Sequence, residues 1–286
     1  MGFRTILSMK LIKRTFNKRF FLAKLTNFPV IGHAIEFAFF EDDDIIILPK
    51  DSVIEKNQKK NKVIKIDLSF EPEAMVLPSQ IIEHFIRKSR YHFIMNHCIC
   101  REANGCKDYP QDLGCIFLGR GVLKIDRRLG RLVTMEEALA HLEKCRKAGL
   151  VHLVGRNKID SVVFSNTPKE ELLSICSCCP CCCLWRMVPQ LSKKISDTVT
   201  KMPGIRIEID EDLCKGCGAC IKNDVCFVDA ISLEDGSARI REDLCKGCAR
   251  CVEFCPNSAI KLIIEDRNFI EASIKRIAPL VDIESE

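Results

Sequence analysis

The chain has 286 residues, of which 47% are hydrophobic and 29% are charged, a balance typical of a globular protein with a buried core rather than of a disordered one. The net charge of +5 is too small to indicate a nucleic-acid-binding protein by itself, and we expect no nucleic-acid partner. The 19 cysteines are an odd number and no hydrophobic signal segment leads the sequence, which favours a reducing cytoplasm over a secreted disulfide framework.

The first 25 residues carry seven lysines and arginines and no acidic residue, interleaved with apolar residues at helical spacing. We expect residues 1–27 to form a basic amphipathic arm, and two interpretations of it stay open. Either its apolar side covers the core, or residues 1–25 contact an anionic membrane surface or an acidic partner. An organelle transit peptide is a minor alternative. The apolar stretch 28–40 is too short to span a bilayer and contains His33 and Glu36.

Residues 28–190 are predicted to form a cysteine-rich domain of mixed helices and strands. Apolar residues at helical spacing predict a helix over 80–91. Thr134 and Glu137 form a capping-box pattern, and the helix that follows is expected to end at Gly149. Residues 150–154 and 161–164 are expected to pair as a hairpin around the turn 155–157.

Two groups of cysteines lie in this upstream domain, one between 98 and 115 and one with six cysteines between 176 and 183. Neighbouring cysteines form disulfides only with strain, so we expect the two groups to meet and to bind a metal ion or an iron-sulfur cluster. Arg101 then either donates hydrogen bonds to the bound group or pairs with an acid. Cys145 is expected to be a buried packing residue. The candidate ligands, more than one cubane cluster can use, are Cys98, Cys100, Cys106, Cys115, Cys178, Cys179 and Cys182.

Residues 191–204 are polar and end in Pro203-Gly204, which predicts a linker with a domain boundary near residue 203. Beyond it, residues 205–264 contain two cysteine triplets of the same spacing. Each is followed by a fourth cysteine, and the eight residues are Cys214, Cys217, Cys220 and Cys226, then Cys245, Cys248, Cys251 and Cys255.

This spacing indicates 4Fe-4S clusters, because each of the four irons takes one thiolate and a CxxCxxC loop supplies three of them. Structural zinc is the alternative, but zinc prefers two separated pairs of ligands and leaves the third cysteine of each triplet unused. Both triplets also keep Lys-Gly between their first two cysteines, and both halves close on Ala-Ile, as an internal duplication would produce.

On these residues the segment 205–264 resembles the bacterial-type two-cluster 4Fe-4S ferredoxins. In that family the fourth cysteine of each triplet serves the other cluster. The resemblance thus implies that Cys255 completes the cluster of Cys214, Cys217 and Cys220, and that Cys226 completes the cluster of Cys245, Cys248 and Cys251. The first half departs from the pattern, with five residues instead of three before Cys226 and no proline after it. We expect a bulge that leaves Cys226 a ligand; the alternative is a cluster with three protein ligands.

The upstream part, from about residue 78, is similar to ferredoxin-like proteins from anaerobes that carry a CxCR segment and a cysteine run before a two-cluster domain. The resemblance implies architecture and little about reaction. The expected fold class is α+β, with a C-terminal ferredoxin-like two-cluster domain of pseudo-twofold symmetry and an N-terminal mixed α/β cysteine-rich domain. Residues 265–286 are expected to form a helix and tail, the helix covering one face of the cluster domain.

These features predict an electron-transfer protein with two 4Fe-4S clusters, a possible third cluster upstream and a redox protein as partner. It would be a redox partner or subunit of a larger oxidoreductase system. Two alternatives stay open. One is a reductase whose active site is the upstream cysteine domain, fed by the ferredoxin clusters. The other is a redox sensor that reads DNA through a winged-helix-like part at 134–164.

Overall fold

The computed structural model describes residues 2–59, 77–164, 168–222, 224–266 and 268–285. The helices, including the 3-10 segments labelled η, are α1 (Gly2–Thr15), η1 (Phe16–Lys18), α2 (Arg19–Leu25), α3 (Pro29–Phe39), α4 (Asp51–Lys59), α5 (Ser79–Lys88), α6 (Ile99–Ala103), η2 (Arg120–Lys124), α7 (Met135–Lys147), α8 (Lys158–Val163), η3 (Lys169–Glu171), η4 (Leu184–Gln190), α9 (Lys193–Ser196), α10 (Arg250–Phe254), α11 (Phe269–Ile277) and η5 (Ala278–Leu280). The strands are β1 (Asp44–Ile47), β2 (His92–Met95), β3 (Ile116–Leu118), β4 (Gly130–Val133), β5 (Val151–Arg156), β6 (Leu173–Cys178), β7 (Val199–Lys201), β8 (Ile205–Ile209), β9 (Ile231–Glu234), β10 (Ser237–Ile240) and β11 (Ile260–Ile264).

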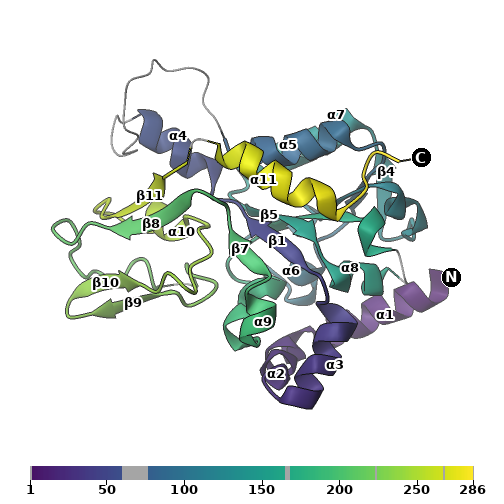
Figure 1. The fold of residues 1–286 in the computed structure, drawn as a ribbon, viewed down its shortest axis with the longest axis horizontal. Coiled ribbons are helices and arrows are strands. Elements are labelled where there is room, and N and C mark those ends of the chain that lie inside the picture. The colour runs from purple at the N-terminus through teal and green to yellow at the C-terminus, as the bar shows by residue number, and fades with distance from the viewer. Residues whose placement is uncertain (1, 60–76, 165–167, 223, 267, 286) are drawn as a thin grey trace.

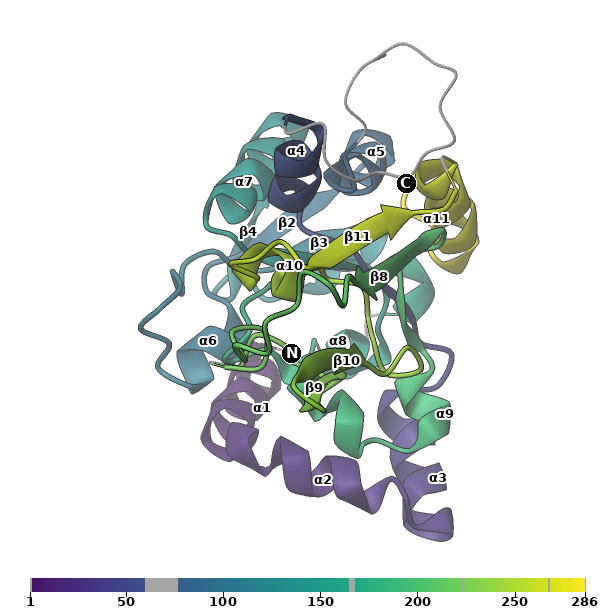
Figure 2. The ribbon, with the colours of Figure 1, turned by 90° about the vertical axis from the view of Figure 1, so that its left-hand side faces the viewer.

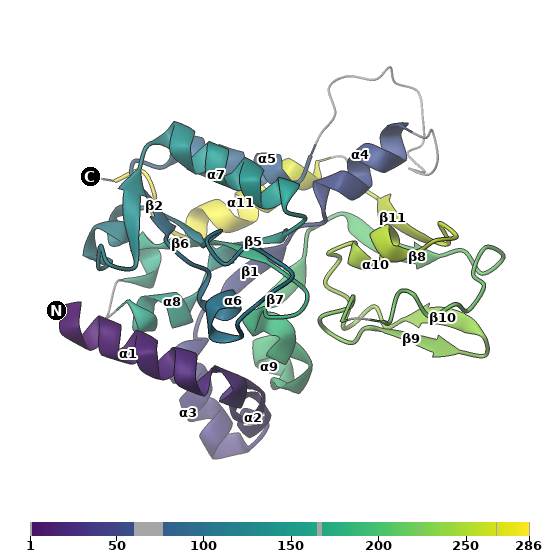
Figure 3. The ribbon, with the colours of Figure 1, turned by 180° about the vertical axis from the view of Figure 1, so that it is seen from behind.

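A seven-stranded sheet with the order β4-β2-β3-β6-β5-β1-β7 forms the centre of the upstream part. Neighbouring strands are antiparallel except β1 and β7, which run parallel. Helices α4, α5, α7 and α11 lie on one side of this sheet, and α6, α8, α9 and the N-terminal helices lie on the other (Figures 1 and 3). The predicted α+β class is confirmed.

Alternating side chains of β1 show how the sheet separates two cores. Ile46 belongs to the core under α4 and α5, whereas Ile45 and Ile47 belong to the opposite core with Trp185. All three isoleucine side chains are buried, because successive residues of a strand point to opposite faces and both faces are covered.

The capping box is confirmed: Glu137 N donates to Thr134 Oγ1 at 3.2 Å, and Thr134 N donates to Glu137 Oε2 at 3.0 Å. The helix expected over 80–91 is present as α5. The hairpin prediction was wrong, because β5 pairs with β1 and β6 and the expected second strand is α8. Asn157, which resembled a turn residue, caps this helix by accepting a hydrogen bond from Ile159 N at 3.2 Å. The expected hairpin of a winged-helix DNA reader is thus replaced by a helix.

Helices α1 and α2 lie along the body of the protein. Met9, Phe16 and Ala23 are buried, and Lys13 forms a 2.6 Å ion pair with Glu102 of α6. One side of the predicted arm therefore covers the core, as one of the two interpretations expected. Within the described part of the chain no helix combines the length and apolarity that crossing a membrane requires.

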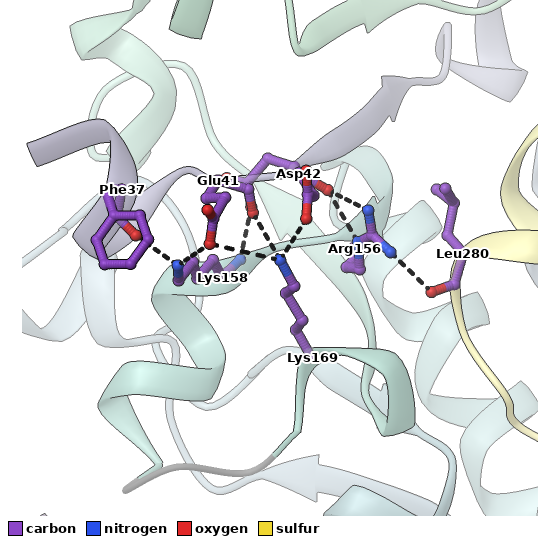
Figure 4. A network of polar contacts seen from close by, with 8 residues as sticks. Phe37, Glu41, Asp42, Arg156, Lys158, Lys169 and Leu280 are labelled. Carbon is purple, nitrogen blue, oxygen red and sulfur yellow. Dashed lines mark hydrogen bonds and ion pairs between the residues drawn. The ribbon is translucent and has the colours of Figure 1, made fainter. Parts of the chain in front are cut away.

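A network of polar contacts fixes the corner between α3 and β1 to the rest of the sheet (Figure 4). Lys158 at the start of α8 pairs with Glu41 at 2.6 Å, and Lys169 pairs with Asp42 at 2.7 Å. Arg156 at the end of β5 donates two hydrogen bonds to the carbonyl oxygen of Asp42, at 2.6 and 2.8 Å. The N-terminal helices are thereby attached to the strands that lead to the upstream cysteines.

The segment 191–204, predicted to be a linker, is built into the fold. Its strand β7 extends the central sheet by parallel pairing with β1, and Val199 and Met202 are fully buried. The C-terminal helix α11 also differs from expectation, since its main contacts are with α5 and β5 of the upstream part. Its apolar side chains Phe269 and Ile277 account for this position, because they join the core that contains α5.

The cysteine triplets lie in a small lobe beside the central sheet, built on two antiparallel strand pairs, β8 with β11 and β9 with β10. Figure 2 shows the two pairs stacked with the cysteine-bearing loops between them. Ile207 and Leu262 pair across β8 and β11 and connect the lobe to the upstream core.

Candidate iron-sulfur and metal centres

The structure brings together four cysteines at the outer end of the lobe. We call them the first quartet: Cys214, Cys217, Cys220 and Cys255. All four line one cavity, and Cys217 is exposed to solvent. Ala238 N lies 3.4 Å from Cys214 Sγ as a hydrogen-bond donor. Gly216, between the first two ligands, has φ +58°, and a Cβ there would lie 2.2 Å from Gly236 O, so the loop requires glycine.

The other four cysteines of the lobe form the second quartet: Cys226, Cys245, Cys248 and Cys251. Burial raises the pKa of Cys251 well above its ordinary value, and the nearby charges of Cys248, Cys245 and Cys226 raise it further. Burial raises the pKa of Cys245 to about 11, again with Cys248 and Cys226 as neighbours. These thiols lose their protons readily only if a cation or cluster compensates their charge.

Cys226 occupies the same local geometry as Cys255 despite the longer loop before it. Ala230 N donates to Cys226 Sγ at 3.2 Å, and Ala259 N donates to Cys255 Sγ at 3.3 Å. The residue three positions after each cysteine has positive φ, 51° at Asp229 and 54° at Ser258. The chain is therefore back in register at Cys226. The set of eight cluster ligands stays a prediction.

The two quartets lie close together. The charge of Cys220 in the first quartet raises the pKa of Cys251 in the second, after the larger effects of burial and of the second quartet's own thiols. Both quartets border the same apolar core. The lobe therefore presents two neighbouring sites, of which the first contains the exposed thiol of Cys217 and the second contains four half-buried thiols.

The upstream cysteines meet as expected, because the end of β6 lies beside α6, but they form two groups rather than one. In the larger group Cys115 and Cys176 are 3.7 Å apart between sulfurs, and further thiol hydrogen bonds join Cys176 to Cys178, Cys178 to Cys183 and Cys98 to Cys100. Charge interactions connect Cys100 with Cys178 and Cys183. We call this the six-thiol group: Cys98, Cys100, Cys115, Cys176, Cys178 and Cys183.

Four of the five remaining upstream thiols form a tighter set, the compact quartet: Cys106, Cys179, Cys181 and Cys182. All four sulfurs lie within 4.8 Å of one another. Cys145 packs beside them and is fully buried, but it is not a member of the set. The expectation that Cys145 is a packing residue agrees with this position.

The seven upstream candidates thus divide between the two groups, with Cys98, Cys100, Cys115 and Cys178 in the larger and Cys106, Cys179 and Cys182 in the smaller. Cys176, Cys181 and Cys183 were not among the ligands predicted from the sequence. The spacing could have indicated Cys176, because alternate residues of a strand share a face and Cys176 and Cys178 of β6 are such a pair.

Arg101 is fully buried beside the six-thiol group, and within the described residues it has no carboxylate partner. Its guanidinium donates to the carbonyl oxygens of Ser177, at 2.8 Å, and Leu113, while its Nε has no partner. Burial lowers the pKa of Arg101, but the charges of Cys98, Cys178 and other thiols outweigh that effect and raise it. A buried cation requires a counter-charge, and here only sulfur supplies it.

The positive charge of Arg101 in turn lowers the pKa of two thiols in the six-thiol group. A hydrogen bond from Cys100 and then the charge of Arg101 lower the pKa of Cys98 to about 7. A hydrogen bond from Cys176 and one from Cys183, followed by the charges of Arg250 and Arg101, hold the pKa of Cys178 well below its ordinary value. Two thiols of the six-thiol group thus favour the anionic form that a metal or cluster ligand requires. Hydrogen bonds with neighbouring thiols, and burial, raise the pKa of Cys100, Cys176 and Cys183 well above the ordinary value, and burial raises the pKa of Cys115.

The second quartet and the six-thiol group border the same apolar cluster. Cys183 belongs to this cluster, and Cys176, Cys178, Cys226 and Cys248 pack against it. Arg250, buried next to Cys251, donates to the carbonyl oxygen of Cys178 at 2.5 Å. This side chain connects the lobe to the end of β6.

Replacing Cys226 by alanine tests its place in the second quartet. We expect the anaerobically purified variant to lose about four irons and four sulfides per chain, because one cluster loses one of its four thiolate ligands. The measurement is iron and acid-labile sulfide content, with Cys145→Ala as the control that removes a buried cysteine outside both quartets. An unchanged iron content in Cys226→Ala would contradict this placement.

Comparison with known proteins bears on one part of the chain. Residues 238–261 match the family described as 4Fe-4S binding domain, and this segment contains Cys245, Cys248, Cys251 and Cys255. No curated protein and no solved structure matches the chain. The protein therefore contains a 4Fe-4S binding segment that supports at least one 4Fe-4S cluster.

Proposed function

We propose that this protein transfers electrons through two 4Fe-4S clusters, held by the first and the second quartet, as a redox partner or subunit of a larger oxidoreductase system. Support comes from the matched family segment and from the equal geometry of Cys226 and Cys255. It also comes from the cavity that the first quartet lines. A bound cluster supplies a one-electron redox centre. The chain itself supplies thiolates, amide donors and shielding from water.

The observation that carries this proposal is the continuity of the three cysteine sites. Cys217 of the first quartet is exposed, and the half-buried second quartet lies beside it. Arg250, next to Cys251, donates to the carbonyl oxygen of Cys178 in the six-thiol group. This order leads from a surface where a redox protein can dock to the interior of the upstream part. We place a third cluster at the six-thiol group, where Arg101 provides a buried positive charge.

Anaerobic iron and sulfide analysis of the full chain, with electron paramagnetic resonance after dithionite reduction, tests the proposal. We expect about eight irons per chain from the two quartets, and about four more if the six-thiol group is filled. Two interacting spins should appear on reduction, because the quartets are neighbours. An iron content at or below about four per chain would contradict the two-cluster assignment.

A second candidate function, a reductase with its active site at the six-thiol group, is favoured by one observation. This group has two more thiols than a cubane cluster uses, and Cys115 and Cys176 are 3.7 Å apart. Two electrons and two protons delivered there would reduce a small disulfide to two thiols.

Cystine provides the test of this second function. In the reductase, dithionite-reduced wild-type protein is reoxidised by cystine under anaerobic conditions, and Cys115→Ser loses that reaction while its cluster absorbance is retained. The variant Cys145→Ser serves as the matched control. Equal reoxidation in Cys115→Ser and wild type would exclude the dithiol at this position and leave the electron-carrier function.

We further propose that the N-terminal helices contact an anionic membrane surface. Helices α2 and α3 expose large apolar side chains, among them Phe21, Val30 and Phe37, and Val30 is 83% exposed. Lys18 and Lys24 are exposed on the same segment. Apolar side chains combined with cations are the features that interfacial helices use.

Sedimentation with phosphatidylglycerol vesicles checks the membrane proposal. We expect the wild-type protein to sediment with these vesicles at low salt and to be released at high salt, because cations contribute to binding. Phe21→Ser with Val30→Ser should reduce binding several-fold, whereas Leu123→Ser, at an exposed site elsewhere, should not. Equal binding of wild type and the double variant would contradict the assigned surface.

A further inference from the structure

The compact quartet differs from the other cysteine sites in the distances between its sulfurs. Cys181 Sγ lies 3.5 Å from Cys179 Sγ, 3.5 Å from Cys182 Sγ and 3.7 Å from Cys106 Sγ. No other group of three or more potential metal ligands within the described residues has all its ligand atoms within 4.8 Å. The sulfurs of the first quartet, and those of the second quartet, are therefore more widely spaced than the sulfurs of the compact quartet.

These distances are those of four thiolates on a single ion. A tetrahedral zinc ion with Zn–S bonds of about 2.3 Å holds its sulfurs about 3.8 Å apart. Thiolates on a cubane bind four different irons at the corners of the cluster, and they must stand further apart. The compact quartet has the spacing of a single ion, whereas neither the first nor the second quartet has all its sulfurs within 4.8 Å of one another.

Local backbone structure places each of the four thiols. Gly105, with φ +56°, ends α6, and the hydrogen bonds Gly105 N to Glu102 O and Cys106 N to Arg101 O form a Schellman motif. Cys106 is thereby turned toward the end of β6. There Pro180 lies in a tight turn that brings the other three cysteines together.

The surroundings fit a closed structural site. Leu150 and Ala148 pack beside the quartet, and Tyr109 and Leu113 cover it from the loop after α6. Backbone amides of residues 108 and 109 donate to Cys106 Sγ, and the amide of Cys182 donates to Cys179. All four ligand positions of a tetrahedral ion are taken by protein sulfur, which is typical of structural rather than catalytic zinc.

We propose that Cys106, Cys179, Cys181 and Cys182 bind one zinc ion as a structural tetrathiolate site. This site is separate from the clusters of the proposed function and does not depend on them. The ion joins two segments that lie more than seventy positions apart in the sequence, the loop after α6 and the turn after β6. Both segments also carry members of the six-thiol group. The zinc ion therefore holds the backbone of that group in place without taking part in electron transfer.

Metal analysis and zinc K-edge X-ray absorption of the anaerobically purified full chain test this site. We expect about one zinc per chain, with four sulfur ligands at about 2.3 Å. Cys106→Ser and Cys181→Ser should each lose that zinc while keeping the iron of the ferredoxin clusters. Cys145→Ser, the buried neighbour outside the quartet, should retain both metals.

Several results would overturn the proposal. One is loss of about four irons and four sulfides, rather than zinc, from Cys106→Ser, since that would place a cubane here. Nitrogen or oxygen ligands at the zinc, or one iron without sulfide in its place, would also overturn it. The absorption spectrum of the wild-type protein decides the matter even where the variants fail to fold. A missing ferredoxin cluster would leave this result unchanged, so the two proposals fail independently.

Discussion

The buried guanidinium of Arg101 sets the main constraint on the upstream half. A cation removed from water costs several kcal/mol unless opposite charge surrounds it, and within the described residues no carboxylate does so. Cysteine sulfur must therefore supply the negative charge, which explains why so many thiols are gathered around one side chain. The helix α6, the end of β6 and the loops that close over them all serve this arrangement.

A second buried arginine, Arg250, lies at the boundary between the lobe and the central sheet. Arg250 follows the second CxxC pair, lies buried, and donates to a carbonyl group of β6. Nearby, Lys50 pairs with Glu253, and Lys246 donates to Ser196 O at 3.2 Å. These contacts make the interface between the lobe and the sheet polar at its edge and apolar at its centre, where Phe227 and Val228 pack. The two halves consequently share one continuous interior.

Much of the local structure could be predicted from sequence, because its causes are local. The capping box at Thr134, the helix α5 and the loops that carry the two cysteine triplets depend on residues a few positions apart. Asn157 was ambiguous, since the same side chain begins a turn or caps a helix, and only the neighbouring strands β1 and β6 decide between them. The division of the upstream cysteines could not be predicted, because it depends on the Schellman turn at Gly105 and on the register of β6. The number of residues between Cys106 and Cys179 reveals neither the conformation of this turn nor the register of this strand.

The parallel pairing of β7 with β1 has a consequence for how electrons would move through the molecule. Three residues separate β7 from β8, and on the far side the chain returns through α11 to pack on α5. The lobe is thus an insertion held at both ends, not a tethered domain that swings between donor and acceptor. Transfer inside this chain would need no diffusional search and would proceed at a rate independent of protein concentration. In the proposed function, the step at the exposed Cys217, where a redox protein would dock, would depend on encounter.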